Sequence, residues 1–213
     1  MVALSKTPAR VIGIALLLIL LFAPIAIPYR VVALALAAMV WIWLEAGSLK
    51  PIGLGRHRIA STLMWGFGIF IGVTIFGAVS EPVFDRLLGL KADYTGYGAL
   101  VGNPLLALRL LGFALISASI GEEILFRGFL QYQLTALLGP DTMARWAIIL
   151  AGGAIFGVAH YIQGPLGIIN TGIAGAIFGW AWFRTDRNLW ALILAHALTD
   201  SFGIGMLYFG RNI

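Results

Sequence analysis

Long apolar stretches alternate with short polar connections along the whole chain. At about 20 apolar residues per crossing, each of the longer stretches can be a membrane-spanning helix. They cover roughly residues 11–27, 31–49, 61–79, 105–120, 146–160, 168–183 and 189–208. The pattern predicts an all-α fold, a polytopic transmembrane helix bundle of seven or eight spans, with residues 1–213 forming a single transmembrane domain.

Proline, glycine and length indicate where these helices end. Pro24 and Pro28 are expected to close the first helix. Residues 105–138 would measure about 51 Å as one helix, more than a ~30 Å hydrocarbon core, so this segment must tilt, protrude or break near Gly121. Residues 80–104 form the longest connection and are predicted to be a loop over one mouth of the bundle.

Glycines spaced four apart allow helix backbones to approach closely in lipid. The chain has 27 glycines, and we expect three pairs to mark tight packing within one bundle: Gly68 with Gly72, Gly153 with Gly157, and Gly175 with Gly179.

The composition supports a lipid environment. Hydrophobic residues make up 61% of the chain, charged residues only 11%, and the mean hydropathy is +0.96, whereas soluble domains have about 25% charged residues. The absence of cysteine excludes disulfides and thiolate chemistry. The net charge of +5 comes from scattered basic residues with no basic stripe, so we expect no nucleic-acid partner.

The basic residues predict the orientation, because Lys and Arg collect in cytoplasmic loops. One side of the membrane would carry Lys6, Arg10, Lys50, Arg56, Arg58, Arg145, Arg184 and Arg187, and the other Arg30, Arg86, Lys91 and Arg211. We therefore expect a cytoplasmic N-terminus and, with seven spans, an external C-terminus.

Ionisable side chains inside spans cost at least ~2.5 to 3.5 kcal/mol each at a helix centre, so they indicate a functional polar cavity. Glu45 and Arg109 lie near span ends, where they can snorkel. The others form three groups, at residues 121–127, 156–160 and 196–200.

Helical spacing suggests how these groups act. Glu123 and Arg127 are four residues apart and can pair along one helix face, while Glu122 points about 100° away and is available for acid–base chemistry. His196 and Asp200 also share a face.

A Glu-Arg pair alone can be structural, and His160 alone can be an ordinary residue at a helix end. Three such clusters in three apolar helices are harder to explain without function. We expect Glu122, His160, His196 and Asp200 to surround one cavity, open to the cytoplasm or laterally to lipid.

The three motifs resemble those of the CAAX-protease and bacteriocin-processing family, called CPBP or Abi. The family is marked by Glu-Glu-x-x-x-Arg, Phe-x-x-x-His and His-x-x-x-Asn/Asp helices in that order. The matching residues are Glu122, Glu123 and Arg127, then Phe156 and His160, then His196 and Asp200. The resemblance covers residues 120–210 and implies a catalytic core at residues 105–210.

The resemblance implies an intramembrane endopeptidase related to the enzyme that removes the last three residues of prenylated CAAX proteins. Glu122 and His160 would activate a water, and His196 and Asp200 would stabilise the oxyanion. Eukaryotic CAAX proteases typically have Asn at the last position. An ionised Asp only accepts hydrogen bonds, so we expect Asp200 to hold His196 in its charged donor form.

The resemblance leaves a metal open. Glu122, His160 and His196 could hold a divalent metal such as zinc, but the chain has no His-Glu-x-x-His motif. We favour a metal-independent glutamate mechanism with no cofactor.

The predicted partners are the lipid bilayer and a peptide or membrane-protein substrate, with prenylation and oligomeric state open. The small size resembles prokaryotic members, which places the protein in the cell (inner) membrane.

The alternative is a non-proteolytic scaffold or immunity protein that uses the same pocket. A transporter should show repeated halves, which are absent, and neither Gly-x-Ser-x-Gly nor a membrane Asp pair is present.

Overall fold

The computed structural model describes residues 4–91 and 93–211, and within them the secondary structure is entirely helical. The long helices are α1 (Thr7–Leu21), α2 (Ile27–Ala46), α3 (Ile59–Leu88), α4 (Pro104–Phe113), η3 (Ala114–Gln131), α5 (Tyr132–Leu138), α6 (Thr142–Ala159), α7 (Gly164–Arg184) and α8 (Leu189–Tyr208). Short 3₁₀ turns lie at η1 (Lys50–Ile52), η2 (Thr95–Leu100) and η4 (Tyr161–Gln163). The predicted all-α bundle is confirmed.

Among the described residues, six helical segments are long and apolar enough to cross a membrane. They are Pro28–Ala46, Ile59–Leu88, Pro104–Leu138, Thr142–Ala159, Tyr161–Arg184 and Leu189–Tyr208, and α1 is a shorter apolar helix. Each of the predicted apolar stretches therefore corresponds to one of these helices or to α1. The protein is an integral membrane protein by this measure.

Proline and side-chain caps determine where several helices begin. α1 ends before Pro24, and Pro28 lies in the first turn of α2, where its missing N–H is tolerated, so Pro28 opens the second helix rather than closing the first. The side chains of Asn103, Asp141 and Asn188 accept backbone hydrogen bonds at the starts of α4, α6 and α8.

α3 is longer than its apolar stretch. It continues to Leu88 and ends at Gly89, which has a φ of 64°, so the first part of the predicted loop at residues 80–104 is helical instead. Its 30 residues measure about 45 Å, more than a ~30 Å hydrocarbon core. The polar last turns, which carry Glu81, Asp85 and Arg86, therefore extend past the apolar part.

The helix from Pro104 to Leu138 is continuous and does not break at Gly121. Its middle part, η3, is wound as a π-helix, a rare form often found at functional sites. Gly121 matters for packing: an added Cβ would lie 2.8 Å from Val31 of α2, so only glycine fits here without a shift.

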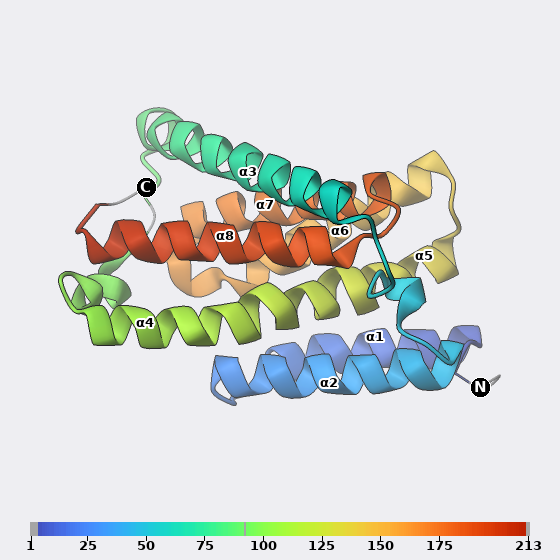
Figure 1. The fold of residues 1–213 in the computed structure, drawn as a ribbon. Helices are drawn as coiled ribbons and strands as arrows, with labels where there is room; N and C mark the ends of the chain where they lie inside the picture. The colour runs from blue at the N-terminus through green and yellow to red at the C-terminus, as the bar shows by residue number, and fades with distance from the viewer. Residues whose placement is uncertain (1–3, 92, 212–213) are drawn as a thin grey trace.

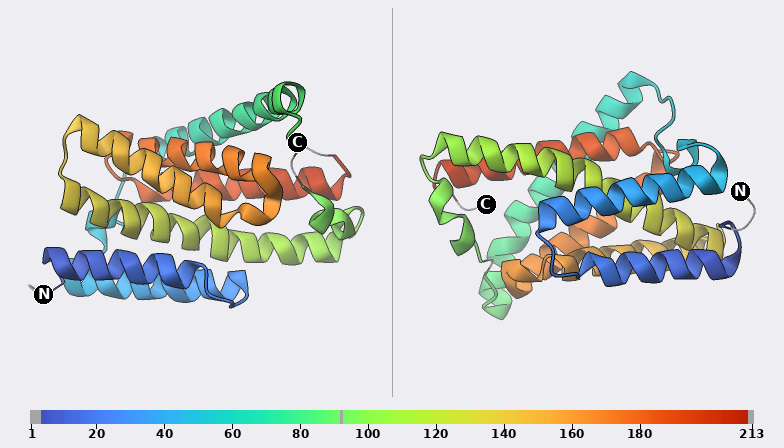
Figure 2. Two further views of the ribbon diagram at one scale, coloured as in Figure 1. Left: turned by 180° about the vertical axis from the view of Figure 1, so that it is seen from behind. Right: turned by 90° about the horizontal axis from the view of Figure 1, so that it is seen from below.

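The helices form layers, with α1 and α2 on one side, the long α4–η3–α5 helix next, then α6, α7 and α8, and α3 on the far side (Figures 1 and 2). Glycines bring α6 and α7 together, because a Cβ on Gly153 or Gly157 would clash with the α7 backbone. A Cβ added to Gly68 or Gly72 on α3 would have no neighbour within 4 Å among the described residues, so the prediction of tight packing there is wrong.

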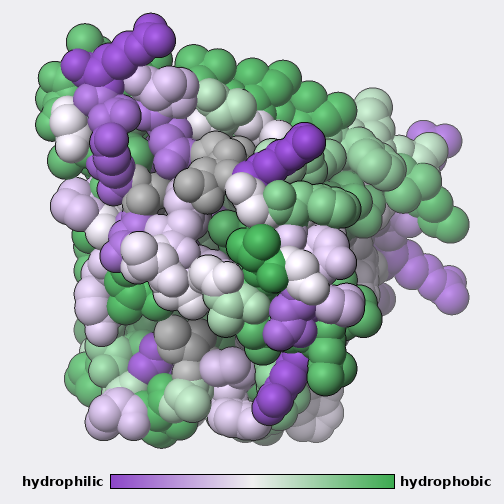
Figure 3. Space-filling model, turned by 90° about the vertical axis from the view of Figure 1, so that its left-hand side faces the viewer, coloured by the Kyte–Doolittle hydropathy of each residue, from purple (hydrophilic) through white to green (hydrophobic). Residues whose placement is uncertain are grey.

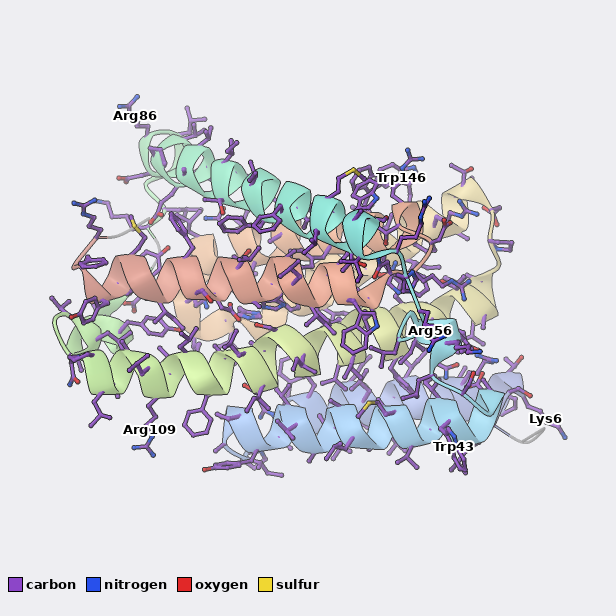
Figure 4. All side chains as sticks on the ribbon, viewed as in Figure 1. Lys6, Trp43, Arg56, Arg86, Arg109 and Trp146 are labelled. Carbon is purple, nitrogen blue, oxygen red and sulfur yellow. The ribbon has the colours of Figure 1, made fainter. Side chains whose placement is uncertain are left out.

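Charged side chains lie mainly at the two ends of the bundle. Lys6 and Arg56 lie at the end where α1 begins, and Arg86 and Arg109 lie at the opposite end (Figure 4). Which end faces the cytoplasm stays a prediction.

Candidate active site

One cavity of about 160 Å³ brings the three polar groups together in the membrane-spanning part of the bundle. Its ionisable lining residues come from η3, from the end of α6 and from α8: Glu123, Arg127, His160, His196 and Asp200. Phe156 and Phe178 form apolar walls. Residues up to 77 positions apart in the sequence thus share one polar space inside an apolar bundle.

Glu122 is not one of the residues that line this cavity, but it lies beside it. Its carboxylate interacts electrostatically with His160, His196, Asp200 and Glu123. Its Oε2 is buried and has no hydrogen-bond partner within the part of the chain that the structure describes. An unmatched buried carboxylate oxygen is costly unless a water or a substrate group satisfies it.

Glu123 is the centre of the buried hydrogen-bond network. Its side chain is fully buried, and its Oε1 lies 2.9 Å from Nη1 of Arg127 and 2.8 Å from Nδ1 of His196. The predicted pair with Arg127 is present. Glu123 also reaches across to α8, a contact that spacing along one helix cannot indicate.

Several contacts hold the Arg127 guanidinium in place. Its Nη2 donates to the carbonyl of Gly175 at 3.1 Å, and its guanidinium lies 4.8 Å from the ring centre of Phe156 and 5.0 Å from that of Phe178. Cation–π contacts and the buried carboxylate together compensate the desolvation of this charge. The close approach of α6 and α7 is what brings these groups to Arg127.

His160 presents one ring nitrogen to the cavity. Its Nδ1 lies 2.8 Å from the backbone oxygen of Phe156, and because a carbonyl only accepts, Nδ1 must carry a proton. In the neutral ring Nε2 then has a lone pair, which can take a proton from a water. The Phe156 ring, 4.6 Å from the imidazole centre, restricts its orientation.

Asp200 lies beside His196, as expected from their spacing, and also contacts Ser119. Its Oδ1 lies 3.7 Å from Nε2 of His196, and its Oδ2 accepts a 2.9 Å hydrogen bond from Ser119. The carboxylate closest to His196 is therefore that of Glu123, not that of Asp200. Ser119 was missed in the sequence, although residues 119, 123 and 127 recur every four positions and so share one helix face.

The described residues contain no group of side chains arranged to hold a metal ion. Within residues 4–91 and 93–211, no three His, Asp or Glu side chains are grouped as ligands for one ion, and the predicted set of Glu122, His160 and His196 does not form such a group.

The cavity lies toward the end of the bundle away from the start of α1. His160 ends α6 and Gln163 precedes α7, and the backbone of Gln163 accepts a hydrogen bond from Asp93 in the connection after α3. Figure 3 looks onto this end, where hydrophilic and near-neutral residues are interspersed with hydrophobic ones. A cytoplasmic N-terminus would therefore place the cavity nearer the external face, so that orientation does not agree with a mouth open to the cytoplasm.

The part of the chain that contains the three motifs also matches a known family model. Residues 104–202 match the family model described as type II CAAX prenyl endopeptidase Rce1-like. The matched segment, residues 104–202, is a domain of the CPBP family. No curated protein and no solved structure matches the chain. The CPBP match contains all three polar groups and leaves α1, α2 and α3 outside, and at the family level it indicates a membrane-embedded protease.

Proposed function

We propose that this protein is an intramembrane endopeptidase that hydrolyses a peptide bond in a membrane-associated peptide or protein. The observation that carries the proposal is the convergence of ionisable groups from three helices on one cavity of an apolar bundle. A bundle that only needed to be stable would gain nothing from this arrangement, because each buried charge costs solvation.

Glu122 and His160 are the proposed pair that activates water. Glu122 Oε2 and His160 Nε2 are acceptors with no hydrogen-bond partner in the described structure; His160 lines the cavity, and Glu122 lies beside it and interacts electrostatically with His160. The water oxygen would attack the scissile carbonyl carbon while its proton moves to Glu122. The same proton would then pass to the amine nitrogen as the C–N bond breaks.

His196 is the proposed donor to the oxyanion. Its Nδ1 is engaged by Glu123, so only Nε2 remains for the substrate, and Nε2 can donate when the ring is an imidazolium. Carboxylates beside both nitrogens, Glu123 and Asp200, stabilise that charged ring. Glu123, Arg127 and Ser119 act as positioning residues.

The test is cleavage of a peptide library by the purified protein in detergent, with and without a chelator. We expect wild type to cut, and His160→Gln to lose at least ~10²-fold in rate, as for loss of a general base. His57→Gln is the matched control, because His57 contacts only the backbone of Gly53 near the opposite end and should leave the rate unchanged. Peptides that bind but stay intact would support the scaffold alternative instead, and loss of cleavage with chelator would contradict the metal-independent mechanism.

A further inference from the structure

A second cavity of about 200 Å³ adjoins the catalytic one, between α3 and the pair α7 and α8. The two cavities share five lining residues, Val73, Gln163, Thr171, Ala174 and Thr199. The second cavity is therefore a direct neighbour of the catalytic one. Most of the exposed wall of the second cavity is apolar, and Phe76 and Phe202 contribute to it.

An acidic group without a cation lies in this second cavity. Glu81 is half-buried, and its described interactions are a hydrogen bond with Tyr94 and repulsion from Asp85. Lys91, the nearby cation, pairs with Asp85 at 3.7 Å instead. A half-buried carboxylate beside apolar walls is stabilised by a positive charge, and nothing in the described part of the chain supplies one.

Tyr94 keeps Glu81 in place as an acceptor. Burial and the neighbouring Glu81 carboxylate raise the pKa of the Tyr94 phenol to about 12, so the hydroxyl stays protonated and donates at physiological pH. The Glu81 carboxylate therefore accepts one hydrogen bond from Tyr94 and still lines the cavity.

Two further polar groups in the wall of the second cavity can hydrogen-bond to the backbone of an extended peptide substrate. The side-chain carbonyl of Asn170 accepts a 3.0 Å hydrogen bond from Ser80, which leaves its amide N–H groups as donors. The hydroxyl oxygen of Thr74 is buried with no hydrogen-bond partner among the described residues. Both residues line the second cavity, so a peptide lying there would find partners for its own backbone.

The helix gives the approximate distance along α3 between Glu81 and the catalytic cavity. Val73 lines both cavities, and Glu81 lies eight positions further along α3, about 12 Å at 1.5 Å per residue. An extended peptide covers 3.3 to 3.6 Å per residue, so about three or four residues span this gap.

We propose that the second cavity binds an extended segment of the substrate in which apolar residues are followed by a Lys or Arg that pairs with Glu81, three or four residues from the scissile bond. This inference rests on the proposed protease function and names its substrate class. It uses α3, which lies outside the family match.

The test scans a single lysine through an otherwise neutral, apolar peptide that wild type cleaves, in the full-length protein in detergent. We expect kcat/KM to rise about tenfold when the lysine lies three or four residues from the cleaved bond on one side, and little elsewhere. Glu81→Gln should abolish this preference, and Glu81→Lys should transfer it to a glutamate at the same position.

Asp186→Asn is the control, because Asp186 is an exposed acid in the turn between α7 and α8 and lies outside both cavities, and this variant should keep the wild-type preference. The inference would be overturned if kcat/KM did not depend on the lysine position, or if the preference survived in Glu81→Gln. Cleavage of the peptides would still support a protease in both cases. Absence of cleavage for every peptide would instead overturn the proposed function on which it rests.

Discussion

Two buried ionic clusters lie at different depths in this bundle, one near the start of α1 and one around the cavity, and they differ in how completely they are paired. Near the start of α1, Arg10 lies 2.5 Å from Glu45 Oε1 and donates at 2.5 Å to Gln133, whose amide nitrogen donates at 2.7 Å to Glu45 Oε2. This closed cluster leaves no carboxylate oxygen without a partner. In the cavity cluster, by contrast, Oε2 of Glu122 and Oε2 of Glu123 have none among the described residues.

The two clusters bury charge for different purposes, one for stability and the other for chemistry. The closed cluster connects α1, α2 and α5, and none of its three residues lines the catalytic cavity or the second cavity beside it. The cavity cluster has acceptors that only water or a substrate can satisfy, which costs stability and favours chemistry. The same types of residue therefore act differently because of what is left unpaired.

The largest expected effect is on the rate at Glu122. Glu122→Gln preserves the shape of the side chain but removes the base, so kcat should fall by about 10² to 10⁴. The unfolding temperature should stay the same or rise, because a desolvated charge is removed. Cleavage assays and thermal unfolding in detergent check both, and an active variant would contradict the proposed role.

The closed cluster should show the reverse behaviour. Glu45→Gln leaves the Arg10 charge buried without its partner, which typically destabilises a protein by about 3 to 5 kcal/mol. Denaturant unfolding in detergent should show this loss, while kcat of the folded fraction stays near wild type. A loss of kcat without a loss of stability would break the distinction between the two clusters.

Glu123 should combine both behaviours, since it belongs to the cavity cluster but is paired on Oε1 with Arg127 and His196. Glu123→Gln keeps an acceptor yet removes the charge opposite Arg127, so we expect a stability loss of about 2 to 3 kcal/mol together with a lower kcat. Measuring unfolding and cleavage on the same preparation checks this. Unchanged stability would mean that the Arg127 pair is not a structural contact.

Spacing along single helices predicted part of this picture, and contacts between helices lie outside its reach. The Glu123–Arg127 pair and the set of motif helices follow from the sequence because they depend on positions four apart. Glu45, expected to snorkel at a span end, is buried and 35 positions from Arg10. Such pairings depend on how the helices pack, which local periodicity does not contain.

The role of Asp200 can be resolved by two substitutions. Asp200→Asn still reaches His196 and Ser119 with polar atoms, so kcat should fall only about tenfold, whereas Asp200→Ala should fall about 100-fold, equivalent to a charged hydrogen bond of about 3 kcal/mol. Steady-state kinetics on one peptide compares them. Equal loss in both variants would show that the charge of Asp200, rather than its reach, is what His196 requires.

The smallest expected effect is at Ser119, whose hydroxyl holds Asp200 at 2.9 Å. Ser119→Ala removes one hydrogen bond worth about 1 kcal/mol, so kcat should fall about fivefold with KM nearly unchanged. Ser117→Ala is the matched control, because Ser117 lies on the same helix, is also buried, and donates only to the backbone of Phe113. In the Asp200→Asn background the Ser119 substitution should cost less than it does alone, since the two residues act through one contact, and full additivity in this double-mutant cycle would remove Ser119 from the cavity cluster.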